Sequence, residues 1–296
     1  MIGSMASAQA PNDATDSKTC GAKHLDQCFI DIVHDQAGIW TSPFRLQQAD
    51  AAWLIPFAGA TGAALHYDSD ALNQLGTDQH RVNISHNIAR FGSPEATIGE
   101  GIGLYALGSF TKNQRLAETG RLGAEAVIDA SIVTEAVKLA ANRDRPNQGE
   151  QTGEFWPSGT KGYSTNGSFP SGHATAAWAL ARVIGAEYSS FVPRLLAYGF
   201  ATAVSISRVT GRDHFPSDVL VGSGIGFLTG GYVYRHHSVE RETGLMIQPM
   251  IDMRTRTVGL QVSAPIDGFR HLWRTKRVDI GVDKDSSLAL GMAAAK

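Results

Sequence analysis

Residues 114–142 have the sequence QRLAETGRLGAEAVIDASIVTEAVKLAAN, in which apolar side chains recur at helical spacing. Residues three and four positions apart share one face of an α-helix, so this pattern predicts a long amphipathic helix. Charged residues fill the other face at first and become rare toward Lys138. The apolar positions that define the pattern are Leu116, Leu122, Ala126, Val127, Ile132, Val133, Val137 and Ala140.

The sequence on both sides of this stretch also has a helical pattern, and strand patterns are nearly absent before residue 240. Further helices are expected at 24–40, 48–65, 78–91, 95–111, 173–188, 192–208 and 216–236. After them, 246–253 and 257–262 look extended and predict a hairpin. We therefore predict an all-α fold, a compact multi-helix bundle with a short C-terminal β-hairpin appendage. The expected organisation is a polar N-terminal tail with a short helix (1–40), one helical domain (41–240) and a partly extended appendage (241–296).

The composition excludes several classes of protein. Apolar residues make up 43% of the 296 residues and charged residues 18%, which is an ordinary globular balance. A net charge of -2 gives no basic surface for nucleic acid. A membrane-spanning helix needs about 20 mostly apolar residues. The runs 51–65, 195–207 and 219–234 fall short of this, so we expect buried helices of a soluble domain, with a peripheral membrane or lipid contact left open.

The N-terminal residues carry a hint about the compartment. Residues 1–21 lack the apolar segment of a signal peptide, but the alanine-rich ASAQA resembles the residues around a signal cleavage site. This favours a periplasmic or secreted protein in its mature form. Cys20 and Cys28 have no zinc-site spacing. They could pair in an oxidising compartment, or remain two buried thiols in a cytosolic protein.

Three short motifs carry one kind of chemistry. They are K-x6-R-P from Lys138 to Pro146, P-S-G-H from Pro170 to His173, and S-R-x5-H-x3-D from Ser207 to Asp218. Together they supply three cations, two imidazoles, a carboxylate and a tight Ser-Gly turn. This set could hold a phosphate and attack its phosphorus without a metal.

In the first motif, Lys138 and Arg145 are seven positions apart, about two helical turns, so both could project from one face. Pro146 is expected to end that helix and leave Arg145 at its C-terminus. An arginine fork suits phosphate and a lysine supplies a mobile charge. A solvated basic helix end is the alternative. The long loop 148–169 that follows carries Phe155, Trp156 and Tyr163 and is predicted to be a lid or specificity loop.

The second and third motifs fall at expected helix starts. Ser171 is a natural N-cap, and free backbone N–H groups at Gly172 and His173 would form an anion site. Asp218 lies one turn inside the last helix, where its carboxylate could accept the Nδ1 proton of His214 and direct Nε2 into the site. An ordinary capped helix with an incidental histidine, and a surface His-Asp pair, are the alternatives.

Eleven specified positions in this order are very improbable by chance. The chain resembles the type 2 phosphatidic acid phosphatase family, which shares its core with bacterial class A acid phosphatases and vanadium haloperoxidases. All three family motifs are present between Lys138 and Asp218, whereas the tails carry no resemblance. The resemblance implies a phosphatase with an all-α catalytic core.

The resemblance also implies roles for individual residues. His173 would attack phosphorus and form a phosphohistidine, and His214 would serve as general acid and then base, oriented by Asp218. No metal and no cofactor would be required, and vanadate would inhibit. The phosphate-binding residues would be Lys138, Arg145, Ser171, Gly172 and Arg208.

Two other functions stay open. In a vanadium haloperoxidase, His214 would bind vanadate as a cofactor and His173 would act as an acid–base partner. Such chains are generally much longer, which favours the phosphatase. A non-enzymatic phosphate-binding protein would not need both histidines and Asp218. Soluble phosphomonoesters, phosphatidic acid-like lipids and isoprenoid diphosphates all remain candidate substrates, and the oligomeric state is not indicated. The glycines of Gly222-x-Gly224-x-Gly226 predict close helix packing rather than a nucleotide loop.

Overall fold

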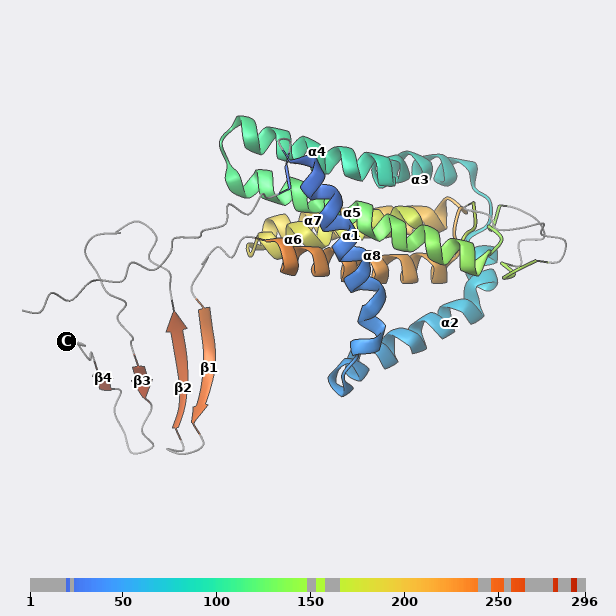
Figure 1. Cartoon of the computed structure of the whole chain (residues 1–296). Helices are drawn as coiled ribbons and strands as arrows, with labels where there is room; N and C mark the ends of the chain where they lie inside the picture. The colour runs from blue at the N-terminus through green and yellow to red at the C-terminus, as the bar shows by residue number, and fades with distance from the viewer. Residues whose placement is uncertain are drawn as a thin grey trace, which may run out of the picture. The chain divides into compact units, whose positions relative to one another are not determined.

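The computed structural model describes residues 20–21, 24–147, 153–157 and 166–238, together with four strands between 246 and 291. The chain divides into two compact units, Met1–Ser238 and Val239–Lys296. The first unit is helical and the second contains the strands (Figure 1). The all-α class of the main unit is thereby confirmed. The boundaries 1–40, 41–240 and 241–296 stay a prediction.

The helices lie close to the predicted ranges. Helix α2 is the main difference, because it continues about ten residues beyond the predicted end at Leu65. The polar residues that follow Leu65 in the sequence do not end the helix. One of them, Asp68, is buried and bonds to Arg143 and Ser217, so this part of α2 is held against the rest of the unit. The helices are α1 (Leu25–Thr41), α2 (Ala51–Leu75), α3 (Gln79–Phe91), α4 (Pro94–Phe110), α5 (Gln114–Ala141), α6 (Gly172–Glu187), α7 (Phe191–Thr210) and α8 (Pro216–His237).

Local capping explains where several helices begin. The side chains of Asp78, Ser93 and Asn113 each accept a hydrogen bond from a backbone N–H in the first turn of α3, α4 and α5. Such caps satisfy donors that have no partner within the helix. Pro94 occupies the first helical position of α4, where its missing N–H costs nothing.

Helix α6 lies at the centre of the unit and packs against α4, α5, α7 and α8. Its side of the core is built mainly from alanines, which let the neighbouring helices approach. The principal core cluster joins three helices and consists of Leu122, Ala126, Val127, Ala130, Ala176, Ala179, Leu180, Val183 and Val233.

The contact between α6 and α8 is closely packed. A Cβ atom placed on Gly226 would lie 2.1 Å from the carbonyl oxygen of Thr175, and one on Gly222 would lie 2.5 Å from that of Ser171. Real Cβ atoms do not approach backbone so closely, so only glycine fits here. The prediction of close helix packing at these glycines is confirmed. As a result the N-termini of α6 and α8 meet, and the Ser171 N–H donates to the Asp218 carbonyl oxygen at 3.0 Å.

The exterior of the unit is unusually apolar. Most side chains of 51–65 in α2 are exposed, including Trp53 (41%) and Ile55 (71%). The expectation that this run is a buried helix was therefore wrong, because α2 contacts little besides α8 and lies outside the α5–α8 bundle (Figure 1). Leu195 and Leu196 on α7 are exposed as well. Among the described helices, none combines the length and the apolar character needed to cross a membrane.

The second unit contains the predicted hairpin. Strands β1 (Met246–Asp252) and β2 (Thr257–Ser263) pair antiparallel, with Met246 opposite Ser263. Two short strands, β3 (Asp279–Gly281) and β4 (Ala289–Gly291), extend the sheet in the order β1-β2-β3-β4. The extended pattern of 246–262 thus predicted the hairpin correctly, whereas β3 and β4 gave no clear pattern.

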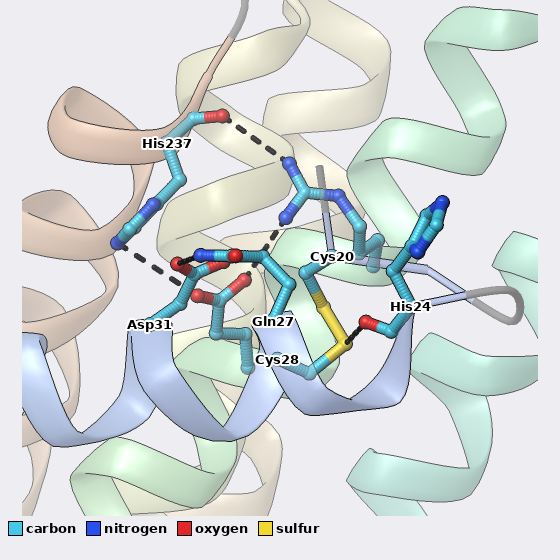
Figure 2. The surroundings of a disulfide bond; sticks show 8 residues. Cys20, His24, Gln27, Cys28, Asp31 and His237 are labelled. Carbon is cyan, nitrogen blue, oxygen red and sulfur yellow. Dashed lines mark hydrogen bonds and ion pairs between the residues drawn. A yellow bond between two sulfur atoms is a disulfide. The ribbon is translucent and has the colours of Figure 1, made fainter. Parts of the chain in front are cut away.

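Cys20 and Cys28 form a disulfide, which answers a question that the sequence left open (Figure 2). The bond joins the segment before α1 to the first turns of that helix. Helix α1 itself packs against α5 and α8.

Candidate active site

The three motifs meet at one end of the helical unit. Lys138 lies in the last turn of α5, its side chain is largely buried, and its Nζ bonds to Glu135 Oε1 at 2.6 Å. A Cβ atom on Gly172 would lie 3.5 Å from this Nζ. Lys138 therefore reaches the N-terminus of α6, where the second motif begins.

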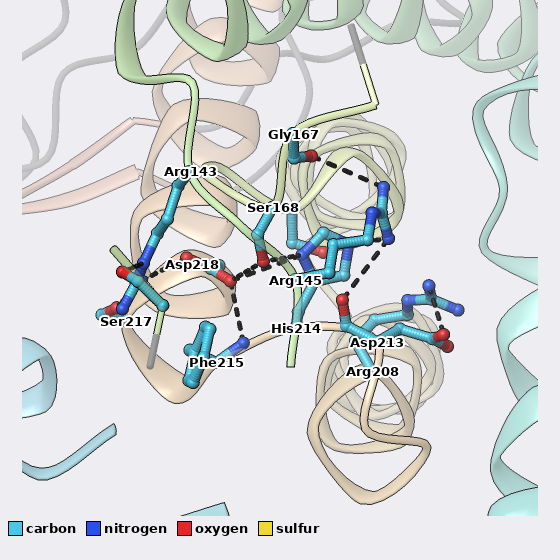
Figure 3. A network of polar contacts seen from close by, with 12 residues as sticks. Arg143, Arg145, Gly167, Ser168, Arg208, Asp213, His214, Phe215, Ser217 and Asp218 are labelled. Atoms are coloured by element: carbon cyan, nitrogen blue, oxygen red, sulfur yellow. Dashed lines mark hydrogen bonds and ion pairs between the residues drawn. The ribbon is translucent and has the colours of Figure 1, made fainter. Parts of the chain in front are cut away.

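Arg145 also lies close to the other two motifs, but it is not on α5 as the sequence predicted. Helix α5 ends at Ala141, because Asn142 takes the left-handed conformation (φ 41°) that asparagine tolerates at a helix end. The placement of Arg145 at the C-terminus of the helix of Lys138 was therefore wrong, and Arg145 lies in the loop that follows. Its Nε donates to the Asn166 carbonyl oxygen at 3.0 Å, and its Nη1 lies 3.5 Å from His214 Nε2 (Figure 3).

His214 and Asp218 form a buried pair at the start of α8. His214 Nδ1 lies 3.5 Å from Asp218 Oδ2, and Nε2 faces Arg145. The Ser168 hydroxyl donates to the same Oδ2 at 2.5 Å and lies 3.4 Å from His214 Nδ1 (Figure 3). The Phe215 N–H adds a third contact to this oxygen at 2.8 Å. The ring is thus held with one nitrogen on the carboxylate and the other toward the cations.

For both His214 and Asp218, burial and the interaction with the partner residue shift the pKa in opposite directions. Burial alone would raise the pKa of Asp218, but hydrogen bonds and charges from His214, Arg143 and Ser168 hold it below its usual range. Burial lowers the pKa of His214 to about 4, although Asp218 acts in the opposite direction. At neutral pH, the pair is therefore a carboxylate beside a neutral imidazole.

His173 occupies the first turn of α6, among the three predicted cations. Burial lowers its pKa to about 3, and Coulombic interactions with Arg208, His214, Arg145 and Lys138, each of which disfavours a second positive charge when protonated, act in the same direction. These four groups come from the first and third motifs, so their joint effect on His173 of the second motif indicates that all three motifs converge on this imidazole. At neutral pH His173 is uncharged and keeps the lone pair that a nucleophile needs.

Ser171 is the N-cap of α6, as predicted, but its side chain makes no cap hydrogen bond. Its hydroxyl oxygen is fully buried and has no hydrogen-bond partner within the described part of the chain. A buried hydroxyl without a partner is costly, so this group is suited to bind a ligand at the helix N-terminus.

Arg208 completes the ring of cations from the last turn of α7. Its Nη2 bonds to Asp213 Oδ2 at 3.0 Å, and Asp213 also contacts His86 at 3.2 Å. The Arg208 Nε is buried and has no hydrogen-bond partner among the described residues. Asp213, which the sequence analysis did not identify, orients this guanidinium beside the site.

Arg143 is the most important residue that the sequence analysis missed. Its side chain is almost fully buried and lies between two carboxylates, at 2.5 Å from Asp218 Oδ1 and 2.8 Å from Asp68 Oδ2. It also donates to the Ser217 hydroxyl at 2.8 Å. Arg143 therefore fixes the face of Asp218 that points away from His214 (Figure 3). No sequence spacing could reveal this contact, because Asp68 is 75 positions away.

The long loop is described only at 153–157 and 166–169. Phe155 packs edge-on against Phe169 at 5.5 Å and lies 4.9 Å from the Arg143 guanidinium. The Trp156 indole donates to the Ala140 carbonyl oxygen at 2.9 Å. These two aromatic residues pin the loop to the end of α5. Tyr163 lies outside the described residues, and the lid role stays a prediction.

The fold and this geometry define a helical protein in which three cationic side chains and two histidines gather at one largely buried place. Lys138, Arg145 and Arg208 would repel a metal ion and attract a phosphate. Residues 122–242, which contain all three motifs, match the family model of the PAP2 superfamily. That segment of the chain is similar to the PAP2 superfamily and makes up less than half of the 296 residues.

Curated relatives that match part of this chain include lipid A 1-phosphatases. That of Porphyromonas gingivalis is 34% identical over 106 residues, which is 35% of this chain and 23% of the relative. That of Rhizobium johnstonii is 31% identical over 105 residues, which is 34% of this chain and 40% of the relative. The matched segment thus spans less than half of either relative.

Solved structures with a similar fold are more distant in sequence. A transmembrane PAP2 type phosphatidylglycerolphosphate phosphatase from Bacillus subtilis is 19% identical, with a TM-score of 0.46 over 74% of this chain and 98% of that one. LpxE from Aquifex aeolicus is 16% identical, with a TM-score of 0.42 over 57% of this chain and 95% of that one.

Proposed function

We propose that this protein is a phosphatase that hydrolyses phosphate esters through a phosphohistidine on His173, without a metal or cofactor. The observation that carries the proposal is a neutral, nucleophilic imidazole at a helix N-terminus, surrounded by three cations and a buried His-Asp pair. The match of residues 122–242 to the PAP2 superfamily and the similarity to phosphatases support it.

In the first step, a ring nitrogen of His173 attacks phosphorus while the bond to the ester oxygen breaks. The negative charge of the bound phosphate raises the pKa of His214 above its value in the empty site, so Nε2 can carry the proton that the leaving oxygen takes. In the second step, His214 accepts a proton from water, which attacks phosphorus and breaks the bond to His173. Inorganic phosphate and the free enzyme result.

The cations would stabilise the charge on the phosphoryl oxygens during both steps. Lys138, Arg145 and Arg208 face the position of His173, and two hydrogen-bond donors are added by the Ser171 hydroxyl and the Gly172 N–H. The unpartnered groups of Ser171 and Arg208 support this assignment, because a bound oxyanion would satisfy both. Arg143, Ser168 and Asp213 act as positioning residues.

We further propose that the substrate is a lipid phosphate. The same helix that contributes Asp68 to the Arg143 network carries the exposed apolar segment 51–65, so an apolar surface adjoins the site. Large exposed apolar areas in a folded protein mark sites of contact with proteins or membranes. A peripheral contact with a lipid surface would bring the headgroup phosphate to His173.

The disulfide supports a periplasmic or secreted location, because such bonds persist in oxidising compartments. Export would also place the enzyme on the outer side of a membrane, where a phosphorylated lipid headgroup is accessible.

The first test is phosphate release from p-nitrophenyl phosphate by the purified protein. His173→Ala should lose at least about 1,000-fold in kcat, whereas the matched change of an exposed histidine, His80→Ala, should leave kcat unchanged. Rapid quenching should trap an acid-labile, base-stable phosphoenzyme that is missing in His173→Ala. Full activity of His173→Ala would overturn the nucleophile assignment.

A second test separates the competing chemistries and substrates. Turnover in EDTA at 25 °C should equal turnover without it, and vanadate should inhibit. Bromide oxidation with peroxide and vanadate, without phosphate release, would instead support a haloperoxidase. A panel of phosphatidic acid-like lipids, isoprenoid diphosphates and water-soluble monoesters should give the highest kcat/KM for a lipid phosphate. Equal values for the water-soluble esters would reject the lipid assignment.

A further inference from the structure

A second cluster of charged side chains lies beside the middle of α5 and the C-terminal end of α8. It contains Asp31 and Asp35 on α1, Glu125 and Asp129 on α5, and His237 at the end of α8, and it is called the acidic cluster below. Helix α8 carries Asp218 at its start and His237 at its end, about 28 Å apart along the helix axis. The acidic cluster is therefore separate from the proposed active site.

The contacts within the acidic cluster engage one oxygen of each carboxylate. His237 Nε2 lies 2.8 Å from Asp35 Oδ1, and Arg121 donates to Glu125 Oε2 at 3.1 Å. Glutamine side chains donate at 2.7 Å to Oδ1 of both Asp31 and Asp129.

The second oxygens of three of these carboxylates are buried without a hydrogen bond in the described part of the chain. They are Asp35 Oδ2, Glu125 Oε1 and Asp129 Oδ2. All three residues are less than 5% exposed. A buried carboxylate oxygen without a donor is expensive, and it is generally paired or coordinates a metal.

The charge of the acidic cluster is also poorly balanced. Its four carboxylates contact two basic side chains, Arg121 and His237. Burial raises the pKa of Glu125 and that of Asp129 to about 7, which reflects the cost of placing these charges together in the interior. An additional positive charge at this position would stabilise the ionised carboxylates.

We propose that the acidic cluster binds a divalent cation through Asp31, Glu125 and His237. One ligand atom of each residue lies within 4.8 Å of the others, and His237 Nε2 is 3.8 Å from Glu125 Oε1. Two ligands on one tetrahedral zinc ion are about 3.4 Å apart, given bonds of about 2.1 Å. Small side-chain rotations would therefore close the site, and an Asp35 oxygen can supply a fourth ligand.

The ligand types select the kind of cation. Calcium takes oxygen ligands only, and magnesium keeps most of its water. One imidazole with two or three carboxylates suits a first-row cation such as Zn²⁺. Because the ligands come from α1, α5 and α8, the ion would cross-link α1 to the bundle. The Cys20–Cys28 disulfide holds the start of the same helix, less than one turn before Asp31 (Figure 2).

The test is titration of the full chain with Zn²⁺ by calorimetry, after removal of bound metal with a chelator and of the chelator by dialysis. We expect one zinc per chain with a dissociation constant in the micromolar range or below. Zinc should raise Tm because it binds the folded state only. Turnover of p-nitrophenyl phosphate at 25 °C should not depend on zinc.

Asp31→Asn and His237→Gln should each weaken zinc binding by at least about tenfold. The matched controls are Asp26→Asn, an exposed carboxylate on α1, and His236→Gln, the neighbouring exposed histidine on α8, and both should bind as the native protein does. His173→Ala should also keep the site. Asp31 and His237 are only partly buried, and circular dichroism at 25 °C should show that their variants are folded.

Three outcomes would overturn the proposal. They are the absence of zinc binding to the native chain, undiminished binding by both cluster variants, and loss of the site in His173→Ala alone, which would place the metal at the active site. Each outcome can occur whether or not the protein is a phosphatase.

Discussion

Burial and neighbouring charge set the protonation of the two site histidines. His173 and His214 both have pKa values well below the ordinary 6.5, chiefly because burial disfavours the imidazolium form. For His173 the surrounding cations add to this effect, whereas Asp218 opposes it for His214. In the proposed mechanism the two imidazoles take different roles, His173 as the unprotonated nucleophile and His214 as the group that carries a proton.

The first prediction concerns the charge of His173. Nitrogen-15 NMR of the imidazoles should show His173 neutral from about pH 7 down to about pH 5, because its pKa is about 3. An unfolded-chain histidine, with a pKa of about 6.5, would be almost fully protonated at pH 5. Protonation of His173 near pH 6.5 would contradict the structure.

The same shift predicts how stability depends on pH. The folded protein binds fewer protons than the unfolded chain at His173, so stability should be full above about pH 6.5 and should fall as pH decreases toward about 3. Urea unfolding at about pH 7 and pH 5 measures this. His173→Gln should reduce the loss between the two pH values, and an unchanged loss would assign it to other groups.

Arg143 gives a second prediction at this scale. Arg143→Met should destabilise the protein by about 3–5 kcal/mol, because it leaves the buried carboxylates of Asp68 and Asp218 without their cation. Activity should fall as well, since Asp218 loses one of the contacts that orient it. Urea unfolding measures the first effect and p-nitrophenyl phosphate hydrolysis the second.

The control for Arg143 is the double variant Arg143→Met with Asp68→Asn. Removing one of the two unpaired charges should restore part of the lost stability while activity stays low. Additive free energies of unfolding would mean that Arg143 and Asp68 are not coupled.

At the scale of elements, the contact between α6 and α8 determines where the site residues of these two helices lie. Glycines at every fourth position of α8 let its backbone touch that of α6, so the helix starts that carry His173 and Asp218 lie together. The left-handed turn at Asn142 has a comparable effect on the first motif. It ends α5 early and sends Arg143 into the interior and Arg145 toward His214.

The α6–α8 contact predicts that Gly226→Ala lowers the free energy of unfolding by about 1–3 kcal/mol, because the new methyl group would overlap the Thr175 carbonyl and separate the helices. Gly199→Ala is the matched control, since a Cβ atom there meets no other atom within 4 Å. It should stabilise α7 by up to about 1 kcal/mol. Equal effects of the two changes would refute the packing argument.

At the scale of the whole molecule, a cationic site and an apolar exterior are combined in one helical unit. The net charge of -2 does not indicate this arrangement, because the cations are local to the site and the exposed apolar side chains lie mainly on α1, α2, α3, α4 and α7. An amphiphilic phosphate could contact both regions at once. The disulfide and the acidic cluster act elsewhere, at the attachment of α1.

The exposed segment of α2 predicts how the protein finds a lipid. Replacing Trp53, Ile55 and Leu65 together with serine should weaken binding to phosphatidic acid vesicles by at least about tenfold, since binding scales with buried apolar area. Hydrolysis of p-nitrophenyl phosphate should not change. Vesicle co-sedimentation is the measurement, and Phe110→Ser, an exposed change at the end of α4, is the control. Unchanged vesicle binding by the triple variant would exclude α2 as the contact.

The sequence by itself determined the helices, the hairpin and the identity of the residues that gather at the site. Helical periodicity, caps and glycine spacing are local properties, so the ranges around Leu122 and Gly226 could be read from neighbouring residues. The three motifs could likewise be read as phosphate chemistry. Their residues meet in space because each lies next to a helix end, and those ends are set by local patterns.

Only the tertiary structure decided which residues distant in the sequence contact one another and which surfaces are exposed. It placed Asp68 on Arg143, paired Cys20 with Cys28, and brought Asp31, Glu125 and His237 together from three helices. It also left 51–65 exposed, although this run has the composition of a buried helix. Burial and long-range charge pairing depend on which surfaces the packed helices leave free, and that is a property of the whole fold rather than of any short stretch of sequence.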